Sequence, residues 1–426
     1  MKPCKIAVIT AISMFAAMSM PIELAAQDTH EQVRYSMKDL GTLGGTFSLG
    51  AGLDNRGWVS GFSTLAGDQE THATLWARGG KIDLRTLGGR NSAAFFGPSE
   101  TGLVVGRAET STPDPFDQDA CGFGTYLTCL PFIWANGLMI ALPTLGGSFG
   151  TGFDVNNRGQ VVGVAAIATQ DPTCAPPFVL GFEPALWEDG LIQQLPTVFG
   201  DPDGFADGIN EKGQAVGGTG NCALTVQNQT DHAVLWENGA ATDLGSLGGT
   251  TNNLATDINN RDQVVGKSNV SDDTTFHAFL WQNGTMTDLG TLAGDFSSQA
   301  DAINSQGQVV GLSCDASGNC RAFLWRDDMM TDLNTLTPAN SPLYALEAIG
   351  INARGEITGY ALQLRTGQIH TFLAVPKTCD AAEPAAAPTV GGSRHRPEVT
   401  LPENVRHLLQ GRAPFGGVKG RLDAVR

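Results

Sequence analysis

The chain has 426 residues, of which 41% are hydrophobic and 54 are glycine, and its formal net charge is −17 at pH 7. This composition indicates a globular protein with many tight turns, because glycine adopts positive φ without steric cost. The negative charge lies on the body of the chain, since residues 393–426 carry seven Lys/Arg against three Asp/Glu. An acidic body argues against nucleic acid as a partner, because phosphates bind Lys and Arg.

The first 26 residues have the three parts of a secretory signal peptide. Lys2 and Lys5 form a basic start, Ile6 to Met20 is an apolar or small-residue stretch, and Leu24-Ala25-Ala26 offers small residues for cleavage. The apolar stretch is shorter than the ~20 residues that a membrane span needs. We therefore expect a secreted protein, extracellular or periplasmic, without a membrane span; an uncleaved N-terminal anchor is the alternative.

A repeated phrase follows and extends over most of the remaining sequence. Each copy contains an I-N-x-x-G-Q-V-V-G step, an H-A-F-L-W step, an Asn-Gly turn and a D-L-G-T-L-G-G link. The link starts at Asp39, Asp83, Ala141, Gln194, Asp243, Asp288 and Asp332, and its shortest spacing is 44 residues. A repeat of ~40–45 residues with several short strands is typical of β-propeller blades.

Each period divides into four short strands. The first ends at the I-N step, and the second begins at Val59, Val104, Val161, Ala215, Val264, Val309 and Ile357 in successive periods. The H-A-F-L-W step is the third strand and the M-T-D-L step the fourth, with turns such as Asn283-Gly284 between them. Asn-Gly between apolar runs predicts a type I′ hairpin. We expect an all-β fold, a seven-bladed β-propeller over residues 33–376.

The two ends of the repeat array complement each other. The last period, Ile351 to Val375, lacks a fourth strand, and the segment Val33 to Leu40 is a fourth strand without the other three. Pairing of the two would close the ring and remove exposed sheet edges. Beyond it, residues 377–426 form an Ala/Pro linker and a basic tail that we expect to be largely disordered, although Leu401 to Gly411 could form a short helix.

The phrases His277 to Trp281, Asp288 to Leu292 and Ile303 to Gly311 resemble the bacterial extracellular HAF repeat family, which takes its name from the His-Ala-Phe step. The resemblance covers about residues 38–375 and recurs in order at a steady period. It implies export and a β-propeller-like repeat fold. It implies little about activity, because the family is named for its repeat and not for a chemistry.

Export makes disulfides plausible, and six cysteines lie within the repeats. The candidate pairs are Cys121 with Cys129, Cys314 with Cys320, and Cys174 with Cys222. The first two pairs are local and would staple loops. The third pair occupies equivalent loops of successive repeats and could bridge them, but Cys379 is left over in the tail and spacing alone does not fix the pairing. No C-x-x-C occurs, and the spacings do not fit a zinc site.

Three residue types recur at fixed repeat positions and invite a functional interpretation. They are His72, His232, His277 and His370; Trp76, Trp134, Trp187, Trp236, Trp281 and Trp325; and Asp39, Asp83, Asp243, Asp288 and Asp332. A metal-binding ring of histidines is broken by Leu130, Glu183 and Arg321 at the equivalent positions. We expect histidines that pack or bond turns, tryptophans buried between blades and aspartates that bind the backbone at glycine turns. They therefore predict neither a catalytic residue nor a metal site.

No cofactor signature occurs, since G-x-S-x-G, H-E-x-x-H, Walker and dinucleotide motifs are absent in the context that they need. Calcium is the one ion that the sequence leaves open. The acidic loops Asp114–Asp119, Asp201–Asp203 and Asp272-Asp273 are its candidates, although none has the D-x-D-x-D-G pattern.

Function is expected where the repeat is interrupted, because insertions in repeat proteins map to loops, often on one binding face. Three consecutive blades carry long cysteine-bearing loops, Glu109–Leu130, Ala168–Phe182 and Cys222–Asp231. Their candidate binding residues are the aromatics Phe116, Phe123, Tyr126 and Phe178. We expect these loops to form one patch; loops that are merely stabilised by disulfides are the alternative.

The sequence favours a secreted, non-catalytic binding or scaffolding module for an extracellular protein or glycan. Two alternatives remain open: a glycan hydrolase or lyase that works in the central channel, and a purely structural surface protein. An enzyme would need irregular acid and base residues on the axis, whereas the first strands repeat small and apolar residues. The oligomeric state is not set by the sequence.

Overall fold

The computed structural model describes residues 33–377 except 175, 177 and 226–228, and also residues 401, 403 and 405. The predicted signal peptide, the linker, most of the basic tail and Cys379 lie outside the described residues. The described part is almost entirely β-structure, as the repeat period predicts. Its helices are α1 (Cys222–Thr225) and one 3₁₀ turn (Leu333–Leu336).

The strands form consecutive four-stranded antiparallel meanders, which we call units. Unit 1 is β2 (Gly44–Leu53), β3 (Val59–Leu65), β4 (Thr71–Ala77) and β5 (Gly80–Asp83). Unit 2 is β6 (Gly88–Ala94), β7 (Val104–Pro113), β8 (Leu127–Ala135) and β9 (Leu138–Ala141). Unit 3 is β10 (Gly146–Val155), β11 (Val161–Gln170), β12 (Leu180–Glu188) and β13 (Leu191–Gln194).

Unit 4 is β14 (Asp203–Ile209), β15 (Ala215–Gly220), β16 (His232–Glu237) and β17 (Ala240–Asp243). Unit 5 is β18 (Leu254–Ile258), β19 (Val264–Asn269), β20 (Phe276–Gln282) and β21 (Thr285–Asp288). Unit 6 is β22 (Ser297–Ile303), β23 (Val309–Cys314), β24 (Cys320–Arg326) and β25 (Met329–Asp332). Unit 7 is β26 (Leu343–Ile351), β27 (Ile357–Gln363), β28 (Ile369–Pro376) and β1 (Tyr35–Asp39).

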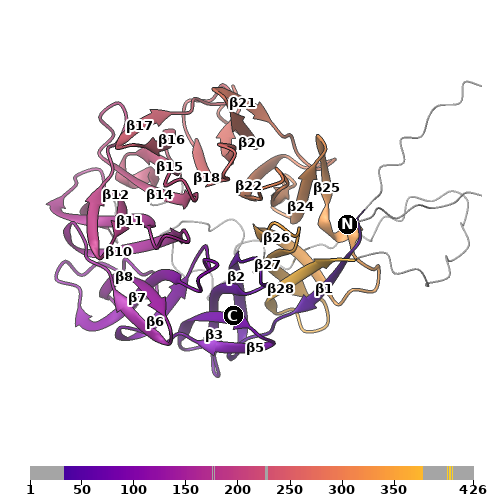
Figure 1. Cartoon of the computed structure of the whole chain (residues 1–426), viewed down its shortest axis with the longest axis horizontal. Coiled ribbons are helices and arrows are strands. Elements are labelled where there is room, and N and C mark those ends of the chain that lie inside the picture. The colour runs from indigo at the N-terminus through magenta and orange to yellow at the C-terminus, as the bar shows by residue number, and fades with distance from the viewer. Residues whose placement is uncertain are drawn as a thin grey trace, which may run out of the picture.

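The units are arranged around a common axis, with first strands such as β2, β18, β22 and β26 nearest to it (Figure 1). Units 4, 5 and 6 are separate four-stranded sheets. Single parallel bridges join unit 7 to unit 1, at Phe47 and Ile369, and unit 2 to unit 3, at Phe149 and Cys129. The second strand of every unit begins at the residue that the V-V-G step predicts.

The strand β1 supplies the fourth strand of unit 7. It pairs with β28 in antiparallel register, from Tyr35 opposite Pro376 to Asp39 opposite Phe372. Tyr35 is buried against the apolar residues of units 6 and 7. The sequence places the missing strand of the last period at this position.

The hydrophobic cores lie between neighbouring units, because each meander has two faces to cover. Phe279 of unit 5 is fully buried and packs in one cluster with Val216 and Leu235 of unit 4. Phe323 of unit 6 repeats this arrangement against Val265 of unit 5. The phenylalanine of the His-Ala-Phe step therefore recurs in the sequence because it fills the space between two units.

The loops divide the molecule into two faces. We call the side that holds the loops between first and second strands, and between third and fourth strands, the turn face. We call the opposite side the insertion face; it holds the loops between second and third strands and the links from one unit to the next.

On the turn face, five of the seven units carry an asparagine that bonds to the next unit. In units 3 to 7 these are Asn156, Asn210, Asn259, Asn304 and Asn352. Asn259 shows the pattern: its Oδ1 accepts from two amides of its own turn, and its Nδ2 donates to Gln263 Oε1 at 2.9 Å and to the Asn304 carbonyl at 3.0 Å. Asn352 donates in the same way to the Asp54 carbonyl of unit 1 at 2.9 Å, so the last unit is bonded to the first.

Candidate binding face

The long loops predicted from the interrupted repeats lie on the insertion face. They are residues 114–126 between β7 and β8, 171–179 between β11 and β12, and 221–231 between β15 and β16. Since units 2, 3 and 4 are consecutive, these loops are neighbours on that face. The antiparallel meander explains the placement, because every second strand ends on the same side.

Three disulfides hold loops on this face. Cys121–Cys129 closes the loop of unit 2, Cys314–Cys320 closes the turn between β23 and β24, and Cys174–Cys222 joins the loops of units 3 and 4. The predicted disulfides are confirmed, including the bridge between neighbouring repeats that spacing left open. Every cysteine within the described residues is paired.

Of the four aromatic residues predicted to form the binding patch, two are exposed and two are buried. Phe116 and Tyr126 are exposed, at 38% and 46% of their surface. Phe123 and Phe178 are buried, and Phe178 makes an edge contact with Phe149 of β10 at 5.5 Å between ring centroids. Phe123 and Phe178 therefore support the loops from beneath, and Phe116 and Tyr126 remain as surface.

Two further aromatics join this surface. Phe199, in the link from unit 3 to unit 4, is 79% exposed and contacts the tilted ring of His232 at 4.9 Å between ring centroids. Phe296, in the link from unit 5 to unit 6, is 50% exposed. All four strongly exposed aromatics of the described residues thus lie on the insertion face. The sequence signal was an aromatic residue next to Asp or Gly in a link that is otherwise small and polar.

The repeated histidines bind neighbouring turns, as expected. His277 Nδ1 lies 2.9 Å from an Asp288 carboxylate oxygen, and Asp288 also accepts from the Gly290 amide at 2.7 Å. These hydrogen bonds outweigh burial, which alone would raise the pKa of Asp288, and hold that pKa below its ordinary value. The hydrogen bond that His277 donates to Asp288 raises the pKa of His277.

The same pairing recurs in other units with matching substitutions. His72 contacts Asp83, His370 contacts Asp39 across the junction of the chain ends, and Arg321 stands in for histidine beside Asp332. Since strands three and four are adjacent, these side chains lie beside each other in units 1, 5, 6 and 7. His72, His277 and His370 thus each pair with an aspartate of their own unit, whereas His232 contacts Asp201 in the link before its unit.

Three of the repeated tryptophans fasten their unit to a preceding link, whereas Trp134, Trp281 and Trp325 are only partly buried, so the expectation of burial is wrong for them. Trp76, Trp187 and Trp236 are buried. The indole Nε1 of Trp187 donates to the Pro143 carbonyl at 2.8 Å, and that of Trp236 to the Pro196 carbonyl at 2.7 Å. Burial with a satisfied N–H is what a structural tryptophan requires.

A carboxyl cluster lies beneath the bridged loops of units 3 and 4. Asp203 Oδ1 accepts from the Phe182 amide at 2.8 Å, and Oδ2 is buried without a hydrogen-bond donor. Burial, and then the charges of Asp171 and Glu183, raise the pKa of Asp203 to about 8. Asp203 therefore carries a proton at neutral pH, whereas the pKa of nearby Asp171 is lowered in spite of burial by hydrogen bonds from Thr173.

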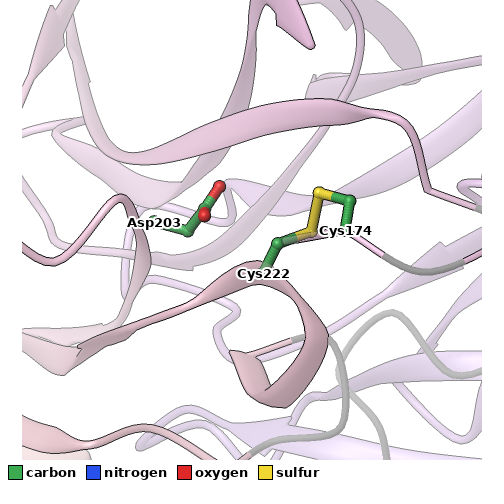
Figure 2. A group of neighbouring side chains, drawn as sticks. All are labelled: Cys174, Asp203 and Cys222. Carbon is green, nitrogen blue, oxygen red and sulfur yellow. A yellow bond between two sulfur atoms is a disulfide. The ribbon is translucent and has the colours of Figure 1, made fainter. Parts of the chain in front are cut away.

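Figure 2 shows the Asp203 carboxyl beside the Cys174–Cys222 disulfide. One oxygen of Asp203 and the two sulfurs lie within 4.8 Å of one another, and they are the one such group of three metal-type ligands among the described residues. A metal would require thiolates. Both sulfurs are bonded to each other, so the oxidised protein does not offer them as ligands.

In the acidic loops that were calcium candidates, Asp114, Asp201 and Asp273 bond to nearby protein groups. Asp114 accepts from the Phe116 and Gln118 amides and from Ser148 Oγ. Asp201 accepts from Thr219 Oγ1 and contacts His232. Asp273 accepts from the amide and hydroxyl of Thr250. These contacts account for the acidic residues as turn-stabilising groups.

The channel contains aspartates that the sequence analysis did not single out. They lie one or two residues before the ends of the first strands of units 3 to 6. Asp207 and Asp301 are buried, and Asp154 and Asp257 are partly buried. Asp154 and Asp257 line a cavity of about 100 Å³ near the turn face, together with the backbone of Gly52, Gly97 and Gly350. The expectation that the first strands carry only small and apolar residues is therefore wrong for these units.

The aspartates of alternate units behave differently. Asp257 Oδ1 accepts from the Ile258 amide at 2.7 Å and Oδ2 from the Ile303 amide of the next unit at 2.8 Å. Asp154 bonds the Val155 and Ile209 amides in the same way. Both carboxylates thus link neighbouring first strands.

Asp207 makes no such bond and is 7% exposed. Burial, and then the charge of Asp154, raise its pKa to about 8, although Lys267 opposes the rise. Burial also raises the pKa of Asp257 to about 7 and that of Asp154 to about 6. The channel therefore holds protons at neutral pH that ordinary aspartates would release.

A sequence signal for these residues existed. An aspartate stands one or two positions before the last apolar residue of the first strand, in F-D-V-N, A-D-G-I-N, T-D-I-N and A-D-A-I-N. The offset alternates, and a register shift interrupts each of these strands at that point. Comparison of equivalent repeat positions therefore misses these aspartates, because their offset from the end of the strand changes from unit to unit.

No family model matches the sequence, and no curated protein matches it. Among solved structures, the chain is similar to the β-propeller domain of the Trilobed protease from Pyrococcus furiosus, with a TM-score of 0.38, 10% identity, and coverage of 65% of this chain and 77% of that chain. A gluconolactonase from Xanthomonas campestris gives a TM-score of 0.34 at 10% identity, covering 82% of this chain and 95% of that chain. A Trypanosoma rangeli sialidase gives 0.35 at 9% identity, covering 81% and 57%. At such identities and TM-scores, no activity is carried over to this chain.

Two further observations concern the compartment. Three disulfides in the described residues are typical of an oxidising environment, extracellular or periplasmic. Among the described residues, no helix has the length and apolar character needed to cross a membrane.

Proposed function

We propose that the protein is a secreted, closed seven-bladed β-propeller of the HAF repeat kind, and that it binds an extracellular protein or glycan through its insertion face without catalysis. The observation that carries the proposal is the position of Phe116, Tyr126, Phe199 and Phe296. These are the strongly exposed aromatics of the described residues, and all lie on one face among disulfide-held loops. Aromatic rings on a rigid surface suit stacking on sugars or burial in a protein interface.

Three observations support closure of the ring: one is the completion of unit 7 by the N-terminal strand, and two are hydrogen bonds between units 7 and 1. These are the β1–β28 pairing, the bond from Asn352 Nδ2 to the Asp54 carbonyl, and the bond from the Thr371 amide to Ser48 Oγ at 2.9 Å. A closed ring would hold the insertion loops at fixed separations. A rigid surface loses little conformational entropy on binding.

The test is a glycan array, together with binding to extracellular matrix and envelope proteins, on the full mature chain. We expect F116A/Y126A and F199A/F296A to reduce binding at least tenfold. The matched control is L138A/I140A, which removes exposed apolar side chains from β9 on the outer rim. Equal binding by all variants would contradict the proposal, and turnover of any glycan by the wild type would contradict its non-catalytic part.

A hydrolase or lyase is the second candidate, and the Asp171–Asp203 pair is the observation that favours it. Two neighbouring carboxyls with pKa values shifted in opposite directions are suited to general acid–base chemistry. Against it, the Asp203 carboxyl is fully buried under the loops. A hydrolase screen of the wild type and of D203N decides: activity lost in D203N would support the enzyme.

A further inference from the structure

A cluster of buried apolar side chains fills the insertion-face end of the axis; we call it the mouth cluster. Its members include Phe47 and Leu49 of β2, Phe149 of β10, Phe178, and Tyr344 and Leu346 of β26. The same cluster contains Leu401 and Val405 from the C-terminal tail, which are 2% and 0% exposed. Two tail residues are thus as deeply buried as the core of the units.

The spacing of these two residues matches one face of a helical turn. Leu401 and Val405 are four positions apart, so they share a face, while Glu403 between them is exposed. The Leu401 amide donates to Asn319 Oδ1 at 3.3 Å, in the turn that the Cys314–Cys320 disulfide closes. The contact therefore combines apolar burial with a polar anchor on the insertion face.

Charge favours the same placement. Residues 393–426 have an excess of four positive charges, whereas the rest of the chain is strongly negative. Acidic residues on the insertion face include the exposed Asp117, Asp272 and Asp273. Asp315, in the same turn as Asn319, has a pKa held below its ordinary value despite burial by bonds from Asn319 and Ser317, so it is charged at neutral pH. Opposite charges would guide the tail to this face.

We propose that the mouth cluster is a docking site for the chain's own segment around Leu401 and Val405, which covers the axis on the insertion face. The site recognises a short amphipathic segment with apolar residues at positions i and i+4 and basic residues beside it. A partner that uses the mouth must have similar chemistry and must displace the tail. This docking does not depend on the binding function proposed above.

The first experiment uses limited trypsin digestion of the full mature chain, followed by intact mass spectrometry. Arg406 follows Val405 directly, so docking should protect the bond after it. We expect L401D/V405D to be cleaved there at least tenfold faster than the wild type. The control L364D places the same charge at an exposed leucine of the insertion face and should leave the rate unchanged. Equal rates in wild type and L401D/V405D would refute docking.

The second experiment supplies the segment in trans. A fluorescent peptide of residues 397–412 should bind the full-length L401D/V405D protein, measured by anisotropy, and should bind the wild type at least tenfold more weakly because its own tail occupies the site. The peptide with both substitutions should not bind. No binding to either protein, or equal binding to both, would overturn the proposal. A dimer of the wild type that L401D/V405D converts to monomer would show that the tail of a second copy is the occupant.

Discussion

The turn face and the insertion face are built from the same repeats but are stabilised differently. On the turn face, equivalent asparagines make equivalent bonds from unit to unit, as Asn210 does to the Asn259 carbonyl and Asn259 to the Asn304 carbonyl. On the insertion face, loops of unequal length are fixed by disulfides and buried aromatics. The contrast teaches that regular positions of the repeat maintain the fold, whereas irregular ones are free to present a surface.

Among substitutions that compare the two faces, removal of the disulfide between units 3 and 4 should lower the free energy of unfolding most. By loop-closure entropy, loss of the 48-residue link in C174A/C222A should cost about 4 kcal/mol, against about 2.5 kcal/mol for the eight-residue loop of C121A/C129A. Guanidinium unfolding measures both. Equal losses would mean that the bridge acts only within its own loops.

The turn-face network should come next. N259A removes an amide that bonds two units and leaves the Asn304 carbonyl and its own turn amides without their partner, so it should cost about 2–3 kcal/mol. N340A, at an exposed asparagine for which the structure gives no hydrogen bond, is the matched control and should cost less than about 0.5 kcal/mol. Urea unfolding compares the two, and similar costs would remove the asparagine network as a stabilising device.

The channel aspartates provide a pH test of the turn-face end of the axis. Asp207 has a pKa of about 8 in the folded protein against 3.8 as its ordinary value, so the folded state holds the extra proton between these values. Stability should therefore fall as pH rises from about 4 to about 8. D207N should remove part of this fall and be more stable than the wild type at pH 8, by about 1 kcal/mol or more, with no gain at pH 4.

The substitution D257N is the counterpart of D207N. Asp257 accepts amides with both oxygens, so the amide nitrogen of asparagine would face an N–H donor. It should lose about 1–3 kcal/mol at pH 5, where D207N is close to the wild type. Thermal unfolding at pH 5 and pH 8 distinguishes the two, and identical pH profiles would contradict the different roles assigned to them.

The smallest effect on stability should come from the insertion-face aromatics. F116A and F199A remove exposed rings and should change the free energy of unfolding by less than about 0.5 kcal/mol, while F178A, whose ring is buried, should lose about 3 kcal/mol or more. Urea unfolding measures these values. A large loss in F199A would identify that ring as part of the core instead of a binding surface.

The regular parts of the fold were predictable because seven copies of the repeat place the same residue types at the same strand positions. The starts of β3 and β19 follow from the V-V-G step, and the His277–Asp288 contact follows from the adjacency of strands three and four. The inserted loops occur once each, so no second copy of the repeat indicates which of their residues are buried. Phe123 and Phe178 are indistinguishable from Phe116 in an inserted loop, because burial there depends on how the loop folds back and not on any period.

The channel shows a second limit. Asp207 and Asp257 occupy different offsets before the end of their strands, and the register shifts in β14 and β18 change which way a residue faces. Pattern reading assumes a constant register, so a bulge hides these inward-facing aspartates even in a strongly periodic sequence.

The pairing of β1 with β28 also has a consequence for folding order. Tyr35 lies opposite Pro376, so β1, the first of the described strands, pairs with β28, the last of them to be synthesised. Contacts of such long sequence separation form slowly, because the intervening chain must first become ordered. Unit 7 should therefore be completed only once β28 has been synthesised, and a nascent chain that lacks β28 should leave β1 unpaired and open to misfolding.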